Sequence, residues 1–178
     1  MCVLSLQAIA KACAKGGNAP GAKTYIKVTT TDEIASIPAR DDYPTTGDPH
    51  TISGDIVMRA LDGDTPAGVF VNWDFSKMDF VYNSPQQGDE DSPTFQNTIT
   101  FFIPKKTAAK DYALNEAAFA DLVCVIELKD GKREIIGDKG SPARLSVTPQ
   151  ATPKNGYVCT ITQESGELPL NYTGAIVE

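Results

Sequence analysis

The stretch LVCVIELKDGKREIIGD, residues 122–138, carries the strongest fold signal in the sequence. Two runs of β-branched and aliphatic residues flank the dipeptide Asp130-Gly131, which favours a two-residue type I′ turn. Apolar runs joined by such a turn predict a β-hairpin whose strands pair directly. The hairpin is apolar at its base and charged at its tip, so its two ends should meet different surroundings.

A two-residue turn also fixes which residues of this hairpin lie opposite each other. It places Lys129 opposite Lys132, and Glu127 opposite Glu134. Like charges in these positions are unfavourable in an isolated hairpin, although diagonal Glu–Lys contacts or a neighbouring molecule would relieve them. The four charged residues are therefore a candidate interaction surface. The other face carries an apolar strip that should face the core, made of Cys124, Ile126, Leu128 and Ile135.

Length and composition indicate one globular domain with an acidic surface. The chain has 178 residues, of which 41% are hydrophobic and 22% charged, which leaves enough apolar material for a core. Its formal net charge of -7 repels phosphate backbones, because there is no basic excess to displace counterions. Stable nucleic-acid binding is therefore disfavoured, whereas a surface that DNA passes without sticking to is compatible with this charge.

The four cysteines form no metal-binding motif. No two of them have CxxC spacing, and Cys124 and Cys159 lie in strand-like apolar runs, where a free thiol acts as a small hydrophobe. Zinc would need closer clusters and more than one histidine, and the chain has only His50. This cysteine usage favours a reduced, intracellular compartment for assembly.

The N-terminal segment, residues 1–17, predicts a short helix rather than a secretion signal. Its apolar residues recur at helical spacing, and Gly16-Gly17 would end the helix. No basic residue precedes the apolar run, and Lys11 stands where a cleavage site needs small apolar residues. No run approaches the roughly 20 apolar residues of a membrane span.

The rest of the chain consists of short strand-like runs separated by turn signals. Residues 105–122, KKTAAKDYALNEAAFADL, have the composition of a helix. Two long polar connections, residues 29–50 and 83–94, are candidate functional loops. The expected fold is mainly β, an antiparallel β-sandwich or barrel with one flanking α-helix and the short N-terminal helix, in a single domain over residues 1–178.

Patterns that carry chemistry are few. His50 lies in a polar loop without a positioned nucleophile, and residues 137–142, GDKGSP, lack the spacing of a phosphate-binding loop and are better read as a turn. The run Asp89, Glu90 and Asp91 could bind calcium weakly. Because the run lacks EF-hand spacing, a solvated loop is the better interpretation. Nothing in the sequence indicates an enzyme, a cofactor or a resident metal.

Several segments also occur in an informative order. These are the N-terminal helix with its Gly-Gly break, the strand TYIKVTTTDEIASIP, the helix before LVCVIELKDGKREIIG, and the closing NGYVCTITQESGELPLNYTG. This order resembles that of the major tail tube proteins of long-tailed bacteriophages. The second half is the most specific part, with its DGK turn, a strand that ends in glycine, an ITxES-type strand and a Tyr-Thr-Gly end. The resemblance covers most of the chain, although residues 38–49 and 83–94 fall outside it.

The resemblance implies a β-sandwich subunit that forms hexameric rings, which stack into a tube. DNA would pass through the lumen without specific binding, and no enzymatic activity, cofactor or membrane is implied. The expected partners are further copies of the chain and the tail tape-measure, tail terminator and baseplate or tip proteins. The expected location is the virion tail, after assembly in the host cytoplasm. The hairpin residues would then face another subunit or the lumen; they are Glu127, Lys129, Lys132 and Glu134. The residues of the acidic loop would contact another subunit; they are Asp89, Glu90 and Asp91.

Two other classes of protein stay open. One is a tail terminator or head–tail joining protein, because these folds share the architecture of the tube. The other is a non-viral β-sandwich binding module, for example one that binds a carbohydrate. The aromatic residues Trp73, Phe75, Phe80 and Tyr82 would suit a sugar platform, but alternating aromatics in a strand belong more often to a core.

Overall fold

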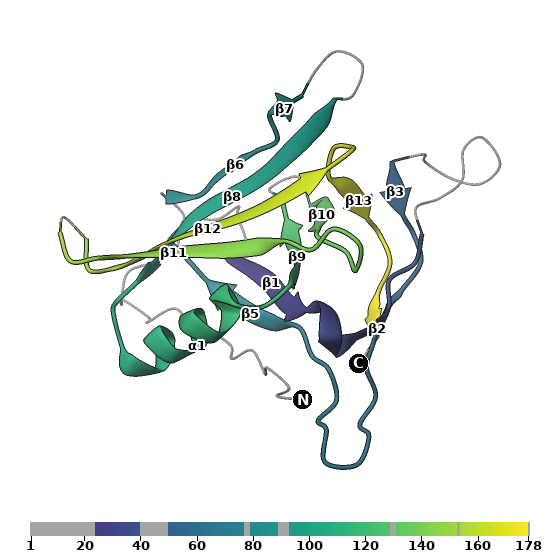
Figure 1. The fold of residues 1–178 in the computed structure, drawn as a ribbon, viewed down its shortest axis with the longest axis horizontal. Helices are drawn as coiled ribbons and strands as arrows, with labels where there is room; N and C mark the ends of the chain where they lie inside the picture. Colours follow the sequence, from purple (N-terminus) through teal and green to yellow (C-terminus); the bar gives the residue numbers. More distant parts are fainter. Residues whose placement is uncertain are drawn as a thin grey trace.

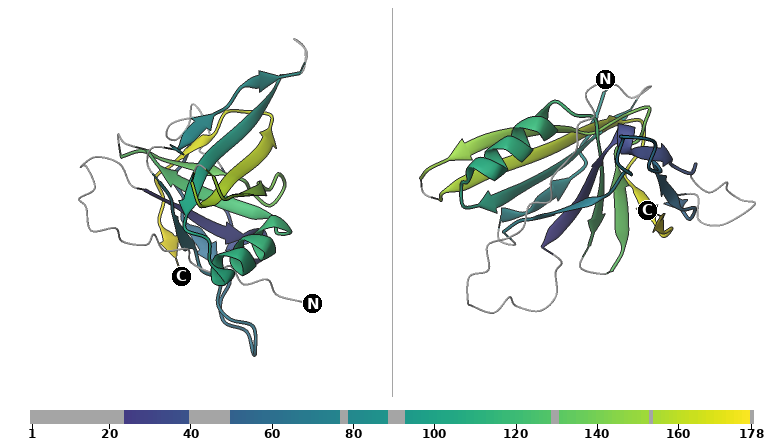
Figure 2. Two further views of the ribbon diagram at one scale, coloured as in Figure 1. Left: turned by 90° about the vertical axis from the view of Figure 1, so that its left-hand side faces the viewer. Right: turned by 90° about the horizontal axis from the view of Figure 1, so that it is seen from below.

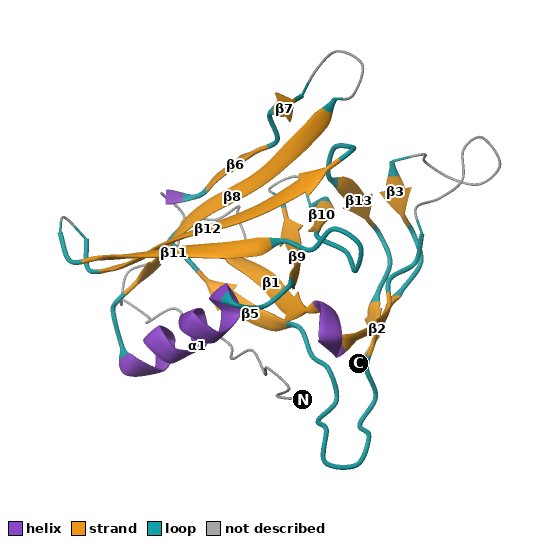
Figure 3. Cartoon of the chain, viewed as in Figure 1, coloured by secondary structure: helices purple, strands orange, loops and turns teal. Residues whose placement is uncertain are grey.

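The computed structural model describes residues 24–39, 50–76, 79–88, 93–128, 131–152 and 154–177. These residues form a mainly β protein, with strands in three sheets and one α-helix beside them (Figures 1 and 3). None of the three sheets closes on itself within the described part of the chain. The helix expected over residues 1–17 lies outside the described residues.

The first sheet has six strands and contains the quoted hairpin. Its strands are β1 (Tyr25–Thr30), β3 (Thr51–Ile52), β5 (Val71–Asp74), β9 (Leu122–Glu127), β10 (Arg133–Ile136) and β13 (Leu170–Tyr172). Their order in space is β3, β13, β10, β9, β1 and β5. All neighbours run antiparallel except β13 and β3, which are parallel. The sheet is therefore mixed, with the hairpin β9–β10 at its centre.

The second sheet crosses in front of the first in Figure 1 and holds the longest strands. Its strands are β6 (Val81–Asn83), β7 (Gln86–Gln87), β8 (Thr94–Pro104), β11 (Arg144–Gln150) and β12 (Gly156–Ser165). The order is β11, β12, β8 and β6, with β7 also paired to β8, and every pair is antiparallel. A small third sheet has the order β14 (Ile176–Val177), β4 (Ile56–Met58) and β2 (Ile34–Ser36).

Two apolar cores lie on opposite faces of the first sheet. The larger one is shared with the second sheet and the helix, and the smaller one with the third sheet and the chain around it. Strand β9 contributes to both, because Cys124 and Ile126 enter the larger core while Val123 and Val125 enter the smaller. A strand buried on both faces needs a continuous apolar run, and this is what the quoted stretch supplies.

The two described cysteines behave as predicted. Cys124 and Cys159 are free and buried in the larger core. Burial raises the pKa of both thiols, that of Cys159 to about 12, because the thiolate would lose its hydration there. Both residues therefore act as small apolar side chains rather than as reactive groups.

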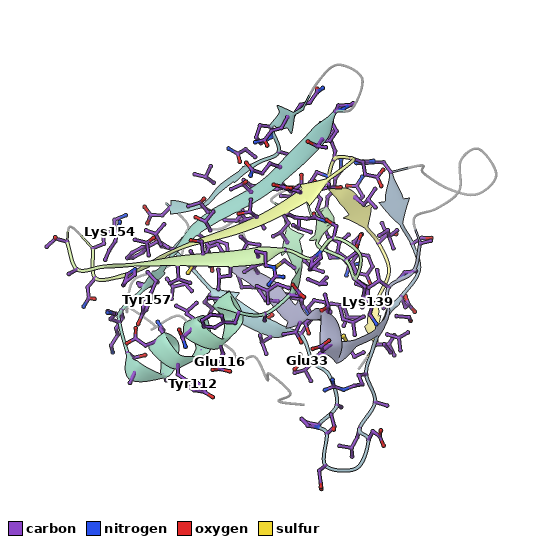
Figure 4. All side chains as sticks on the ribbon, in the orientation of Figure 1. Glu33, Tyr112, Glu116, Lys139, Lys154 and Tyr157 are labelled. Carbon is purple, nitrogen blue, oxygen red and sulfur yellow. The ribbon has the colours of Figure 1, made fainter. Side chains whose placement is uncertain are left out.

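The α-helix, α1 (Ala108–Ala118), packs beside β11 and helps to close the larger core (Figure 2). It begins after Thr107, whose hydroxyl accepts a hydrogen bond from the backbone N–H of Lys110, as a helix N-cap does. The Tyr157 hydroxyl donates to Asp111 at 2.9 Å and ties the first helical turn to β12 (Figure 4). The helix is shorter than the expected 105–122, because Leu122 already begins the buried strand β9.

The long connection expected over residues 29–50 is partly wrong. Thr29 and Thr30 end β1, a 3-10 turn spans Thr31–Glu33, and β2 follows as an edge of the third sheet. Ile34 explains the difference, since its side chain is buried in the smaller core and holds the segment against β4. Residues 40–49 of this connection lie outside the described residues.

The second predicted loop, 83–94, is also partly strand. Gln86 and Gln87 pair with Phe95 and Thr94 at the start of β8, and so extend the second sheet beyond β6. The amide of Gln87 donates to that of Gln96 at 3.0 Å across this pair. The sequence gives no alternating apolar pattern for this strand, because side chains on both faces of the extension are open to solvent. The acidic run Asp89, Glu90 and Asp91 lies outside the described residues.

Candidate functional site

The tip of the hairpin differs from its prediction by one residue. The backbone N–H of Leu128 donates to the carbonyl of Lys132 at 2.7 Å, and that of Gly131 donates to the carbonyl of Leu128 at 3.0 Å. The loop therefore has three residues, and its last residue, Gly131, has the left-handed φ of 84°. This is a three-residue hairpin loop that ends on a glycine, rather than the expected two-residue turn. Lys129 and Asp130 lie outside the described residues.

The shift changes every cross-strand pair of the hairpin. Glu127 lies opposite Arg133 instead of Glu134, so the expected opposition of like charges is replaced by a pair of opposite charges. Because side chains alternate along a strand, the shift also moves Ile135 from the larger core into the smaller one, while Ile136 enters the larger core. The predicted apolar strip is otherwise correct, because Cys124 and Ile126 lie in the larger core and the partly buried Leu128 packs against it.

Glu134 is engaged within the chain. The hydroxyl of Tyr82, on β6 of the second sheet, donates to its carboxylate at 2.5 Å. Burial, and then the hydrogen bond and negative charge of Glu134, raise the pKa of Tyr82 well above its usual range. This contact joins the edge of the second sheet to the hairpin of the first. Of the four predicted surface residues, Lys132 is exposed, Glu127 and Glu134 are half-buried, and Lys129 is not described.

Arg133 holds the C-terminal part of the chain against the hairpin. Its guanidinium donates to the backbone carbonyls of Thr173 at 3.1 Å and Gly174 at 2.9 Å, and lies 5.1 Å from the centre of the Tyr172 ring. Tyr172 is buried, and its hydroxyl donates to the carbonyl of Ala175 at 2.5 Å. Burial also raises the pKa of this hydroxyl. The Tyr-Thr-Gly end noted in the sequence is therefore an anchor that ties β13 and β14 to the smaller core.

A narrow arm, residues 59–68, projects from the body between β4 and β5, at the bottom of Figure 1. Its strands are joined near the tip by reciprocal backbone hydrogen bonds of Asp62 and Thr65, at 3.2 and 2.9 Å. The guanidinium of Arg59 braces the base by donating to the carbonyls of Asp32 at 2.7 Å and Pro66 at 3.0 Å. Leu61, near the tip, is 71% exposed, so the arm presents an apolar side chain away from either core.

The second sheet has two open edges, β6 and β11. Each pairs with a strand on only one side among the described residues. Val81 on β6 is 56% exposed, so this edge strand presents an apolar side chain to solvent. Unpaired strand edges present free backbone donors and acceptors, so they are sites where another chain can add a strand.

The remaining predicted positions show no arrangement for chemistry. His50 leads into β3, where its carbonyl accepts a hydrogen bond from Asn171 at 3.0 Å. Asp138 closes the turn predicted in 137–142, since its carboxylate accepts from the backbone N–H groups of Gly140 and Ser141, both at 2.6 Å. Within the described residues, no group of three or more His, Cys, Asp or Glu side chains is placed to hold a metal ion. No helix in that part of the chain is both long and apolar enough to cross a bilayer.

Sequence reasoning missed a buried polar pair, Asn97 and Gln163, in which the Asn97 amide donates to that of Gln163. They lie directly opposite each other on β8 and β12 and are buried, at 1% and 8% exposure, at the end of the larger core. Asn97 shares its face with Ile99 and Phe101 by the period of two, which would have marked it as an inward-facing amide.

Comparisons with protein families, with curated proteins and with solved structures find no match for this chain.

Proposed function

We propose that this chain is a structural subunit that forms hexameric rings, and that the rings stack into the tail tube of a long-tailed bacteriophage. In this proposal the first two sheets act as a β-sandwich, and the chain has no catalytic role. DNA would pass through the lumen, and the tape-measure, terminator and baseplate or tip proteins would bind the tube. The location would be the virion, after assembly in the host cytoplasm.

The observation that carries the proposal is the pair of open edges on the second sheet. The sheet has four principal strands whose directions alternate, from β11 through β12 and β8 to β6. Rotation about a ring axis preserves strand direction, so β6 of one subunit would meet β11 of the next in the antiparallel sense. A ring built in this way has a repeating interface between two different patches and leaves no edge of the second sheet unpaired.

Two further features support assembly. The arm reaches beyond the body of the subunit with its exposed Leu61, where a single chain offers it nothing to pack against among the described residues. The net charge of -7 suits a conduit for DNA, because like charge disfavours tight phosphate contacts. Both features also suit a terminator or joining ring, so the form of the assembly decides between these proteins.

Negative-stain electron microscopy of the purified chain tests the proposal. We expect stacked rings with a central hole and six-fold averages. Single closed rings that do not stack would favour a terminator or joining protein. A chain that stays monomeric at high concentration and binds a glycan would contradict every ring assembly and favour the binding module.

A further inference from the structure

The outer side of α1 carries two exposed aromatic side chains. Tyr112 is 58% exposed, and Phe119, which follows the last helical residue, is 74% exposed. Residues seven positions apart are almost two helical turns apart, so these two rings lie along one side of the helix, with Glu116 between them (Figure 4). The buried residues Ala113 and Ala117 lie on the side that packs against the body. We call this outer side the aromatic face of α1.

The aromatic face has the properties of a docking surface for an apolar helix. An aromatic side chain buries up to about 150–250 Å² when a partner covers it, which is a large apolar area for one residue. Two such rings in line on one helix form a patch rather than isolated apolar residues, and exposed patches mark interaction sites. A second helix would match this shape, because its own apolar stripe runs along its axis.

The described part of the chain begins beside the same helix. The carbonyl of Thr24 accepts a hydrogen bond from the backbone N–H of Phe75 at 2.9 Å, and Tyr25 pairs with Asp74. The carboxylate of Asp74 lies within electrostatic range of Lys110, near the start of α1. The segment that precedes Thr24 is therefore attached next to the first turn of this helix.

The preceding segment has the length that the aromatic face requires. Residues 18–23, if extended, span about 20 Å, whereas an α-helix with its side chains is about 10–12 Å across. This connection can therefore pass around α1 to its outer side. The helix that the sequence predicts over residues 1–17 would be about 25 Å long, and α1, with 11 residues, is about 16 Å long. The predicted helix is thus long enough to cover the whole face.

The sequence of the segment is complementary to the face. At helical spacing, Val3, Leu6 and Cys13 share one apolar side, and the lysines at positions 11 and 15 lie on the other side. Residues 1–23 contain three lysines and no Asp or Glu. The segment is therefore cationic, so charge does not oppose its approach to the side of α1 that carries Glu116.

We infer that the apolar side of residues 1–17 packs on the aromatic face of α1 in the same chain. Leu6 and its apolar neighbours would cover the rings of Tyr112 and Phe119, while Lys11 and Lys15 stay in water. The larger core would then gain an outer layer beyond α1. The inference concerns a single chain and does not depend on ring formation.

A double-mutant cycle on the full chain, in its monomeric concentration range, tests this contact. Leu6→Ser and Phe119→Ser should each raise the equilibrium constant for urea unfolding by about threefold or more. The double variant should be more stable than the product of the single effects by about threefold or more, because both changes remove the same contact. Leu6→Ser with Leu61→Ser is the control cycle, since Leu61 is 71% exposed on the arm, and there the two effects should multiply.

Cross-linking determines which chain supplies the segment. In a Cys2→Ser/Phe119→Cys variant, a short bismaleimide should join Cys13 to position 119 within one chain, which denaturing electrophoresis and peptide mapping detect. The buried Cys124 and Cys159 should not react in the folded chain. Leu61→Cys in place of Phe119→Cys is the control and should not link to Cys13. Independent effects of Leu6→Ser and Phe119→Ser, covalent dimers instead of the internal link, or no more link than in the control would overturn the inference.

Discussion

Glu33 is a carboxyl group buried at the base of the arm (Figure 4). The hydroxyl of Thr29 donates to it at 2.9 Å, and the same hydroxyl lies 3.0 Å from the carbonyl of Val69. Burial raises the pKa of Glu33 above its ordinary value near 4.5, although the Thr29 hydrogen bond and the charge of Arg59 oppose this effect. The folded chain thus holds the Glu33 proton more tightly than the unfolded chain does.

Glu33→Gln should therefore flatten the dependence of stability on pH. For a carboxyl group whose pKa is raised by folding, the free energy of unfolding falls as pH rises from the unfolded pKa through the folded one. The native chain should lose stability as the pH rises above about 4.5, and the variant should lose less over the same interval. Urea unfolding at several pH values measures the free energy of unfolding of the native chain and of the variant. If the free energies of unfolding of the two chains changed in parallel with pH, folding would not raise the pKa of Glu33.

Gly131 is the residue whose backbone decides the register of the hairpin. Its φ of 84° lies in the left-handed region, and a Cβ there would meet no neighbouring atom. Gly131→Ala should destabilise the chain by about 1–2 kcal/mol from backbone conformation alone. Gly166→Ala is the matched control, since that glycine also has open space around it and no left-handed φ.

The comparison between the two variants isolates the free-energy cost of the left-handed backbone conformation, because neither substitution creates a clash. Gly166→Ala should change stability by less than about 0.5 kcal/mol. The midpoint of urea unfolding, at an unchanged slope, provides the measurement. Equal effects of the two substitutions would mean that the loop at 128–132 adopts another turn in solution.

At the scale of elements, the C-terminal anchor depends on one side chain. Arg133→Met keeps an unbranched stem but removes the hydrogen bonds to Thr173 and Gly174 and the contact with the Tyr172 ring. We expect a loss of about 1.5–3 kcal/mol, since hydrogen bonds that involve a charged group contribute in this range. The amide of Ala175, which donates to Asp55 at 2.7 Å, should exchange its hydrogen faster.

Arg144→Met is the matched control for this prediction. Arg144 pairs with Asp121 at 2.6 Å, but both side chains are largely exposed, so the pair should contribute less than about 1 kcal/mol. Hydrogen exchange followed residue by residue distinguishes the two variants. Unchanged protection at Ala175 in Arg133→Met would show that β14 is held by strand pairing alone.

Local patterns in the sequence predicted the elements that contain a long apolar run or a helix-forming composition. Strands β1, β8, β9 and β12 and the helix α1 fall in this group. The short strands β2 and β7 were missed, because their pairing depends on a partner far away in the chain. The register of the hairpin was missed for a different reason: Asp-Gly suits a two-residue loop and also the end of a three-residue loop.

The candidate site could be predicted only in part. The charged residues of the hairpin were found from the sequence, but the partners of Glu134 and Arg133 come from β6 and the segment after β13. No local pattern specifies such contacts. The pair Asn97 and Gln163 carried a usable signal in its inward-facing register.

At the scale of the whole molecule, the first and second sheets are covered to different extents. The first sheet has a core on each face, so its central strands are fully covered. Among the described residues, the second sheet has an apolar core on one face only, and its edge strands β6 and β11 each pair with one other strand. A natural chain usually protects such edges with charge, with proline or by pairing, and Pro149 in β11 gives only local protection. In the proposed assembly, pairing between copies would satisfy both edges at once.

A charge placed on the edge strand β6 would test whether this edge joins the subunits. Val81→Lys places a charge on β6 where a neighbouring strand would pack, so it should raise the critical concentration for assembly by about tenfold or more, which corresponds to roughly 1.4 kcal/mol per contact. Val57→Lys is the matched control, because Val57 is also exposed but lies on β4, which is paired on both sides. Sedimentation and electron microscopy measure assembly, and circular dichroism checks that both variants fold. Loss of assembly in both variants, or in neither, would exclude β6 as the joint between subunits.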